Sequence, residues 1–197
     1  MKTTQPETVS SFPTVEQLQN ELKRENYRRN YNRVLRSTLF TLICVAAVAI
    51  LIAMLFMPVL QIYGSSMSPC LEDGDIVVTL KRSDFDRGDV ISFYYNNKIL
   101  VKRVIAFPGD WVNLDAEGNV FVNDQLLDEP YLVDKAFGDV NIELPYQVPD
   151  GKLFVMGDHR STSADSRNTA VGCVAEEQIV GRMILRVWPL RSINWIH

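Results

Sequence analysis

The sequence predicts a mainly β protein, with an antiparallel β domain outside the membrane behind one N-terminal transmembrane helix. Three observations lead to this fold class. A stretch with no charged residue runs from Ser37 to Leu71, and most of it is apolar. Basic residues precede that stretch, and acidic residues are the first charges to follow it. Short runs rich in β-branched residues, separated by turn signals, then continue toward the C-terminus.

The apolar stretch is the first element, and it reads LFTLICVAAVAILIAMLFMPVL from Leu39 to Leu60. A helix needs about 20 such residues to cross about 30 Å of hydrocarbon. A cleaved signal peptide would lie nearer the N-terminus, with an apolar part of roughly 7–15 residues, and a buried core helix is rarely apolar all round. We therefore predict a retained membrane anchor at residues 37–60, with Pro58 near its far end.

The charges on either side of the anchor predict its orientation. Six basic residues lie close before it: Lys23, Arg24, Arg28, Arg29, Arg33 and Arg36. No Lys or Arg follows it before Lys81. The positive-inside rule then makes residues 1–36 a cytoplasmic segment and residues 61–197 an extracytoplasmic domain. Thr14 and Gln17 form a capping-box pattern that predicts a helix start, which we interpret as a solvated stalk rather than a partner-binding helix.

The outer domain has the pattern of an all-β structure. Seven segments are strand-like: 75–80, 89–95, 98–105, 111–114, 119–122, 152–156 and 184–188. Asn96-Asn97 is typical of a hairpin turn, and Pro108-Gly109-Asp110 signals another turn. Residues 128–149 are less regular and are expected to form long loops. Many short strands joined by such turns predict an antiparallel sheet or a barrel-like β domain.

The composition argues against several functions. A net charge of -4 on 197 residues argues against a nucleic-acid partner, which usually requires a strongly basic face. The two histidines are His159 and His197, which are few ligands for a histidine-based metal site. We predict no cofactor. The cysteines are Cys44, Cys70 and Cys173, and no pair has CxxC spacing. Free thiols are the favoured interpretation, with a Cys70–Cys173 disulfide as the alternative.

Lys102 and Ser66 are the residues that we expect to carry chemistry. Lys102 lies in the run ILVKRVIAF, where strand alternation places Leu100, Lys102 and Val104 on one face. Burial lowers the pKa of a lysine from about 10.4 by up to about 3–5 units, which makes its amine a possible base. A surface lysine whose stem covers apolar atoms is the alternative. Ser66 lies in the loop at 63–69 directly after the anchor, where it would suit such a base or be an ordinary loop serine.

Four segments occur in the order of a known set of motifs. They are Gly64-Ser65-Ser66-Met67-Ser68-Pro69, then Gly88-Asp89-Val90, then Val101-Lys102-Arg103-Val104-Ile105 with Pro108-Gly109-Asp110, then Gly157-Asp158-His159-Arg160-Ser161-Thr162-Ser163-Ala164-Asp165-Ser166-Arg167. Together they resemble the motifs of bacterial type I signal peptidases. The resemblance covers residues 39–186 when the anchor and Val180-Gly181-Arg182 are included. Each motif alone is a weak signal, whereas four in order behind one anchor are a strong one.

The resemblance implies a role for each residue of the site. Ser66, which precedes the methionine of the first motif, is implied to be the nucleophile. Lys102 is implied to be the general base, and Ser163 to hydrogen-bond that lysine. Asp165 and Arg167 are implied to support the site through an ion pair, although a solvated loop pair is the alternative.

The sequence also departs from the family pattern. The family has Ser or Gly two residues before the nucleophile, and here Gly64 leaves the oxyanion without a hydroxyl donor, so the backbone N–H of Ser66 would remain. Cys70 stands where Thr is usual. His159 and Ser161-Thr162 stand where Asn and Asp-Asn are frequent. None of these changes removes the Ser66–Lys102 pair, but they alter the hydrogen bonding expected around it.

The resemblance implies a membrane-bound serine endopeptidase that removes signal peptides from exported preproteins. It implies that the protein is located in the plasma membrane of a bacterium. It also implies that the enzyme prefers small side chains at the first and third residues before the cut and needs no cofactor. The expected partners are signal peptides, the lipid bilayer and, as a further candidate, the export machinery. Two alternatives stay open: another membrane-anchored Ser/Lys processing protease, and a non-catalytic bitopic protein with a β-rich binding ectodomain.

Overall fold

The structure is a computed structural model that describes residues 14–81 and 84–196. The chain divides into two compact units between residues 52 and 53, and each unit is described by itself. His197, one of the two histidines considered as metal ligands, lies outside the described residues.

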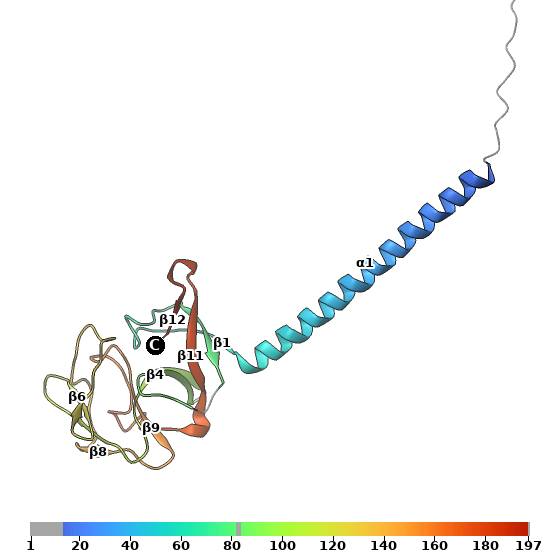
Figure 1. The fold of residues 1–197 in the computed structure, drawn as a ribbon. Coiled ribbons are helices and arrows are strands. Elements are labelled where there is room, and N and C mark those ends of the chain that lie inside the picture. Colours follow the sequence, from blue (N-terminus) through green and yellow to red (C-terminus); the bar gives the residue numbers. More distant parts are fainter. Residues whose placement is uncertain (1–13, 82–83, 197) are drawn as a thin grey trace, which may run out of the picture. The chain divides into compact units, whose positions relative to one another are not determined.

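One long helix makes up the described part of the first unit and enters the second. Helix α1 (Val15–Phe56) is drawn as one continuous helix in Figure 1. It has 42 residues, and none of them is buried. It begins with the predicted capping box, because the N–H of Gln17 donates to Thr14 Oγ1 and the N–H of Thr14 donates to Gln17 Oε1. By length and composition, α1 could cross a membrane.

The helix ends before the apolar run does. It stops at Phe56, two residues before Pro58, which has no N–H to continue a helix. The next residues form strand β1 (Val59–Gln61), so Val59 and Leu60 belong to the β domain rather than to the helix. The predicted anchor boundary at residue 60 therefore lies four residues beyond the helix end.

The larger sheet has eight strands, and every pairing in it is antiparallel. Its strand order is β1-β2-β11-β3-β4-β9-β10, and β12 also pairs with β11. The bounds of the other strands are β2 (Ile76–Leu80), β3 (Val90–Tyr95), β4 (Lys98–Ala106), β9 (Lys152–Met156), β10 (Val174–Ala175), β11 (Ile179–Trp188) and β12 (Asn194–Trp195). Two 3-10 turns flank β11, at Glu176–Gln178 and Leu190–Ser192.

A second, four-stranded sheet has the order β7-β6-β5-β8. Its strands are β5 (Trp111–Leu114), β6 (Val120–Val122), β7 (Gln125–Leu126) and β8 (Tyr146–Gln147). One buried cluster joins it to the larger sheet, because Val112 and Val120 pack with Ile105 and Phe154. The predicted mainly β, antiparallel fold is therefore confirmed, as two sheets sharing a core.

The site depends on how β1 and β4 are paired. β4 pairs with β3 along Lys98 to Arg103, but β9 covers its other edge only from Arg103 onward. β1 is the end strand of its sheet. In the described part of the chain, one edge of β1 and one edge of residues 98–102 in β4 thus have no strand partner. Such free edges can accept an added strand.

Candidate active site

A short loop after β1 carries Ser66. Gly64 has φ +89, a left-handed conformation that glycine adopts readily, and its N–H donates to Asp73 Oδ1 at 2.7 Å. Further along, Met67 is 2% exposed and Leu71 is fully buried, in the same core cluster. The loop is therefore held by a backbone turn on one side of Ser66 and by core side chains on the other.

The Lys102 amine lies against the Ser66 hydroxyl. Lys102 Nζ and Ser66 Oγ are 2.7 Å apart, and Lys102 is only 3% exposed. Burial lowers the pKa of Lys102 to about 8, because a dry environment disfavours the ammonium form. The carboxylates of Asp165 and Asp158 act against this shift and raise the pKa, while Arg167 lowers it. About one molecule in ten therefore has a neutral amine at pH 7.

Asp165 and Arg167 form the predicted ion pair, fully buried. Arg167 Nε donates to Asp165 Oδ1 at 2.9 Å, and Nη2 donates to Oδ2 at 2.9 Å. Arg167 also donates to the carbonyls of Phe137 and Arg160, and the N–H of Gly157 donates to Asp165 Oδ2. Burial alone would raise the pKa of Asp165, but Arg167 and Gly157 hold it below its usual value. The solvated-loop alternative is wrong for this pair.

Ser163 lies close to Ser66, but it does not make the expected hydrogen bond to Lys102. It is 4% exposed, and its hydroxyl makes no hydrogen bond to Lys102, although it helps to lower the pKa of the nearby Asp165 carboxyl. Its side chain instead lies against the α-carbon of Gly157, where an added Cβ would be 2.2 Å from Ser163 Oγ and 2.5 Å from the Ser66 carbonyl oxygen. The expected hydrogen bond from Ser163 to Lys102 is thus absent from this structure, because the hydroxyl packs beside Gly157.

The two residues expected near the oxyanion differ in what they can donate. The N–H of Gly64 already donates a hydrogen bond to Asp73 Oδ1. The N–H of Ser66 donates to no acceptor within residues 14–81 and 84–196. Ser66 therefore has a backbone donor available next to its own hydroxyl, as an oxyanion site requires.

Two further buried ion pairs were not predicted from the sequence. Arg103 donates to both carboxylate oxygens of Asp158, at 2.9 and 2.6 Å, and Arg160 pairs with Glu129. His159, between Asp158 and Arg160, donates its backbone N–H to the Ser66 carbonyl at 3.1 Å. The two pairs fix the 157–160 turn to β4 and to Glu129, and the His159 backbone bond joins that turn to the Ser66 loop. Alternation along β4 could have indicated Arg103, but no sequence signal connects Glu129 with Arg160.

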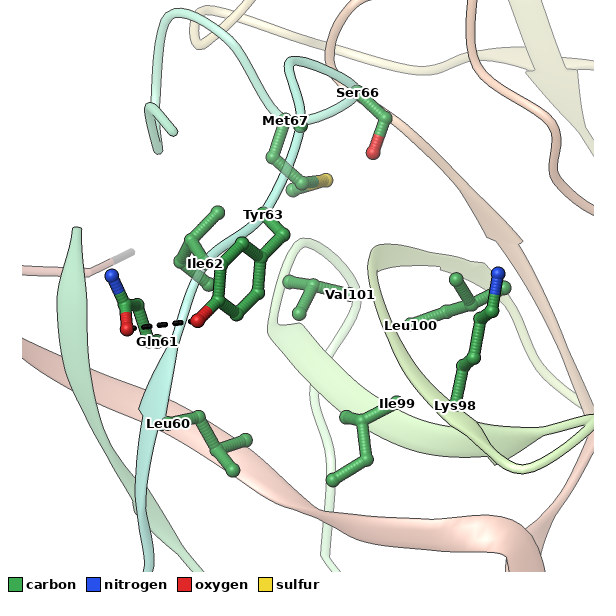
Figure 2. A pocket seen from close by; sticks show the side chains of 11 residues that line it. Leu60, Gln61, Ile62, Tyr63, Ser66, Met67, Lys98, Ile99, Leu100 and Val101 are labelled. Carbon is green, nitrogen blue, oxygen red and sulfur yellow. Dashed lines mark hydrogen bonds between the residues drawn. The ribbon is translucent and has the colours of Figure 1, made fainter. Parts of the chain in front are cut away.

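A mostly apolar cleft of about 550 Å³ leads to Ser66. Its walls are the two segments with free edges, as Figure 2 shows: Leu60 to Tyr63 on one side and Ile99 to Val101 on the other. Ser66 and Met67 lie at one end of this view (Figure 2). The lining residues are Leu60, Gln61, Ile62, Tyr63, Gly64, Ser66, Met67, Lys98, Ile99, Leu100 and Val101.

The remaining candidate residues do not form a second kind of centre. The described residues contain no group of three or more His, Cys, Asp or Glu that could hold a metal ion. Cys44, Cys70 and Cys173 are all free, so the alternative Cys70–Cys173 disulfide is not formed. Burial raises the pKa of the Cys70 and Cys173 thiols, which makes both poor nucleophiles.

Comparison with known proteins agrees with the site. The family model described as "Signal peptidase, peptidase S26" matches residues 34–188, which include the Ser66 loop, β4 and the 157–167 turn. The chain belongs to this peptidase family.

Several relatives are type I signal peptidases. Signal peptidase I U of Bacillus subtilis (strain 168) is 33% identical over 166 residues, which cover 78% of this chain and 88% of that protein. Signal peptidase IB of Staphylococcus aureus (strain COL) is 38% identical over 153 residues, covering 68% and 78%. The crystal structure of a signal peptidase I from Enterococcus faecalis V583 is 27% identical and covers 50% of this chain and 96% of that one, with a TM-score of 0.44. The family assignment depends on the sequence relatives alone.

Proposed function

We propose that this chain is a membrane-bound serine endopeptidase that removes signal peptides from exported preproteins through a Ser66–Lys102 dyad. The observation that carries the proposal is the 2.7 Å approach of Lys102 Nζ to Ser66 Oγ, with the lysine 3% exposed. A lysine in water would be charged and could not accept the serine proton, whereas this one is partly neutral near pH 7.

In the acylation step, neutral Lys102 accepts the Ser66 proton while Oγ attacks the scissile carbonyl carbon. The N–H of Ser66 stabilises the oxyanion that forms. As the C–N bond breaks, the Lys102 ammonium gives its proton to the leaving amine. The products are an ester between the signal peptide and Ser66, a free mature N-terminus, and a neutral Lys102.

In the deacylation step, Lys102 activates a water molecule. The amine accepts a proton from the water as its oxygen attacks the ester carbonyl carbon. When the C–O bond to Ser66 breaks, the ammonium returns that proton to Oγ. The signal peptide leaves as a carboxylic acid, which gives its proton to the solvent to become a carboxylate, and the dyad is restored.

The cleft between β1 and β4 is the proposed binding site for the residues before the cut. An extended peptide there could hydrogen-bond with the free strand edges and present alternate side chains to the walls. Leu60, Ile62 and Val101 make those walls apolar. This fits the small apolar side chains that the family resemblance implies at the first and third residues before the cut.

The proposed topology has residues 1–36 in the cytoplasm, residues 37–60 as the anchor and residues 61–197 on the outer face of a bacterial plasma membrane. Support comes from a single helix apolar enough to span and from the basic residues on one side of it. A bilayer-anchored substrate and Ser66 would then meet at the same depth, which raises their effective concentration. The lipid bilayer is therefore a proposed partner, and the export machinery a further one.

Cleavage of a preprotein by purified full-length variants tests the dyad. Ser66→Ala and Lys102→Ala should each abolish cleavage, because one loses the nucleophile and the other the base. Ser65→Ala is the matched control, since Ser65 is the exposed neighbouring serine in the same loop and should keep full activity. Circular dichroism checks that each variant is folded. Full activity in Ser66→Ala or Lys102→Ala would contradict the proposal.

A further inference from the structure

A second cavity lies beside Ser66, separate from the apolar cleft. It has a volume of about 220 Å³, and its lining residues are Ser68, Pro69, Val133, Asp134, Asp158 and His159. None of these residues lines the cleft between β1 and β4.

Two features place this cavity next to the nucleophile. Ser68 follows Ser66 by two residues in the same turn, with the Ser68 N–H donating to the Ser65 carbonyl at 3.0 Å. His159 also lines the cavity, and its backbone N–H donates to the Ser66 carbonyl at 3.1 Å. The nucleophile loop therefore has the cleft along residues up to Met67 and this cavity from Ser68 onward.

The position of the cavity suggests which part of a substrate reaches it. An endopeptidase must accommodate the chain on both sides of the scissile bond. In the proposed function the residues before the cut fill the cleft, so the residues after it must leave Ser66 by another path. Two described hollows border this loop without sharing a residue with the cleft, one at Ser68 and His159 and one at Pro69 and Cys70. The first is the better candidate, because His159 in its lining bonds the Ser66 carbonyl.

The charge of the cavity indicates what it would bind. Of its two carboxylates, Asp158 is neutralised by Arg103 at 2.6 Å, with both side chains buried. Asp134 is exposed and has no hydrogen bond or ion pair with any residue in the described ranges. The adjacent Lys135 does not neutralise it, because Lys135 Nζ bonds Asn119 Oδ1 at 2.9 Å. The cavity thus presents one uncompensated negative charge.

We propose that this cavity receives the first residues of the mature chain and that Asp134 favours a cationic side chain there. The inference depends on the proposed function, because it takes Ser66 as the point where the substrate is cut. It adds a specificity determinant on the side of the substrate that the cleft does not reach.

The test uses peptides that are identical up to the cut and carry Lys, Gln or Glu at the first or second position after it. With the full-length chain in detergent, kcat/KM should be about fivefold higher for the Lys peptide than for the Glu peptide at one of these positions, as for an exposed charge pair. The ratio should fall at high salt. Asp134→Asn should bring the ratio close to 1, and Asp134→Lys should invert it.

Asp124→Asn is the matched control, since Asp124 is also exposed and lines a cavity in the four-stranded sheet, with Trp111 and Pro145. It should leave the Lys-to-Glu ratio unchanged. Equal cleavage of the three peptides, a preference for Glu, or a ratio that Asp134→Asn does not alter would overturn the inference while leaving the proposed function intact. Failure to cleave any of the peptides would instead contradict the proposed function, and the inference with it.

Discussion

Burial of the Lys102 amine lowers the stability of the folded protein at neutral pH, and it also makes a neutral, reactive amine available. Its pKa falls from 10.5 to about 8, which corresponds to about 3 kcal/mol against the charged form. The unfolded chain therefore holds a proton on this lysine more tightly than the folded chain does. Between pH 8 and 10.5 the unfolded state binds more protons, so the stability of the folded protein rises with pH through that window.

Replacing this amine with an apolar side chain should stabilise the protein at neutral pH. Lys102→Met removes the penalty of about 3 kcal/mol, and the lost bond to Ser66 offsets about 1 kcal/mol, so we expect a net gain of about 2 kcal/mol at pH 7. The gain should disappear as the pH approaches 10.5, where the lysine is neutral in both states. Denaturant unfolding of the full chain at several pH values measures this. A variant that is less stable at pH 7, or a difference that does not depend on pH, would contradict the burial of a titrating amine.

Gly157 is a positioning residue, because its missing side chain lets two parts of the site meet. A Cβ there would be 2.5 Å from the Ser66 carbonyl oxygen, which is backbone and cannot move aside easily. Gly157→Ala should therefore displace Ser66 and lower kcat/KM by about 10²-fold, the usual cost of a misplacement near 1 Å.

The Gly157 variant has an informative partner. Combining Gly157→Ala with Ser163→Ala removes the hydroxyl at 2.2 Å but leaves the clashes with the Ser66 carbonyl oxygen at 2.5 Å and with the Cβ of residue 163 at 2.7 Å, so recovery should be small. Gly172→Ala separates backbone strain from displacement of Ser66: its φ of +65 disfavours any side chain, but its added Cβ would meet only one atom, at 3.9 Å, so it should lower stability without lowering kcat/KM. Unchanged kcat/KM in Gly157→Ala would contradict this role, because it would show that activity does not depend on the close approach of residue 157 to Ser66.

At the scale of elements, strand β4 has two roles along its length. Residues from Arg103 to Ala106 are covered by β9 and hold the core, while Lys98 to Lys102 keep one edge free. The free part lies across the cleft from Leu60 to Tyr63, as Figure 2 shows. The division of β4 thus places Lys102, the proposed base, where structural pairing ends and substrate binding is proposed to begin.

This division predicts where a bound peptide protects the backbone. With the Ser66→Ala variant and an uncleaved signal peptide, amide hydrogen exchange should slow in residues 60–63 and 98–101, because new inter-strand bonds would form there. Exchange in β6 (Val120–Val122), a strand of the other sheet, should not change. Protection that is equal in both regions, or absent from the cleft, would contradict strand addition as the binding mode.

The strands show what local sequence can and cannot predict. β-branched runs and the Asn96-Asn97 turn predicted β3, β4 and their hairpin, and both asparagines have positive φ, as such a turn requires. The two-residue strands β7, β8, β10 and β12 were not predicted, because pairs so short have no periodicity and form only against a neighbouring strand. In the site, the motifs indicated Ser66 and Lys102, but the Arg160–Glu129 pair joins residues 31 apart and depends on the loop between them.

At the scale of the whole molecule, the proposed topology assigns residues 1–36 and residues 61–197 to different compartments. Residues 14–36 are exposed and carry six of the seven basic residues that precede the span, whereas the β unit carries the site. The location of each side is therefore a direct test of the orientation.

Labelling of single cysteines in intact cells gives that test. In a chain whose three native cysteines are replaced by alanine, Glu117→Cys should react with a membrane-impermeant maleimide, because Glu117 is exposed in the outer domain. Asn30→Cys, exposed on α1, should react only after the cells are opened. The reverse pattern would contradict the assigned orientation, and preprotein cleavage by both variants confirms that the labelled protein is native.

The most direct test of the central claim, that a neutral Lys102 is the base for Ser66, is the pH dependence of kcat/KM for a signal-peptide substrate. The amine must be unprotonated to act, so kcat/KM should rise about tenfold per pH unit below a midpoint near pH 8 and then level off. A midpoint near 10.5, the value of an ordinary lysine, or a profile with no step between pH 6 and about 10, would contradict the claim.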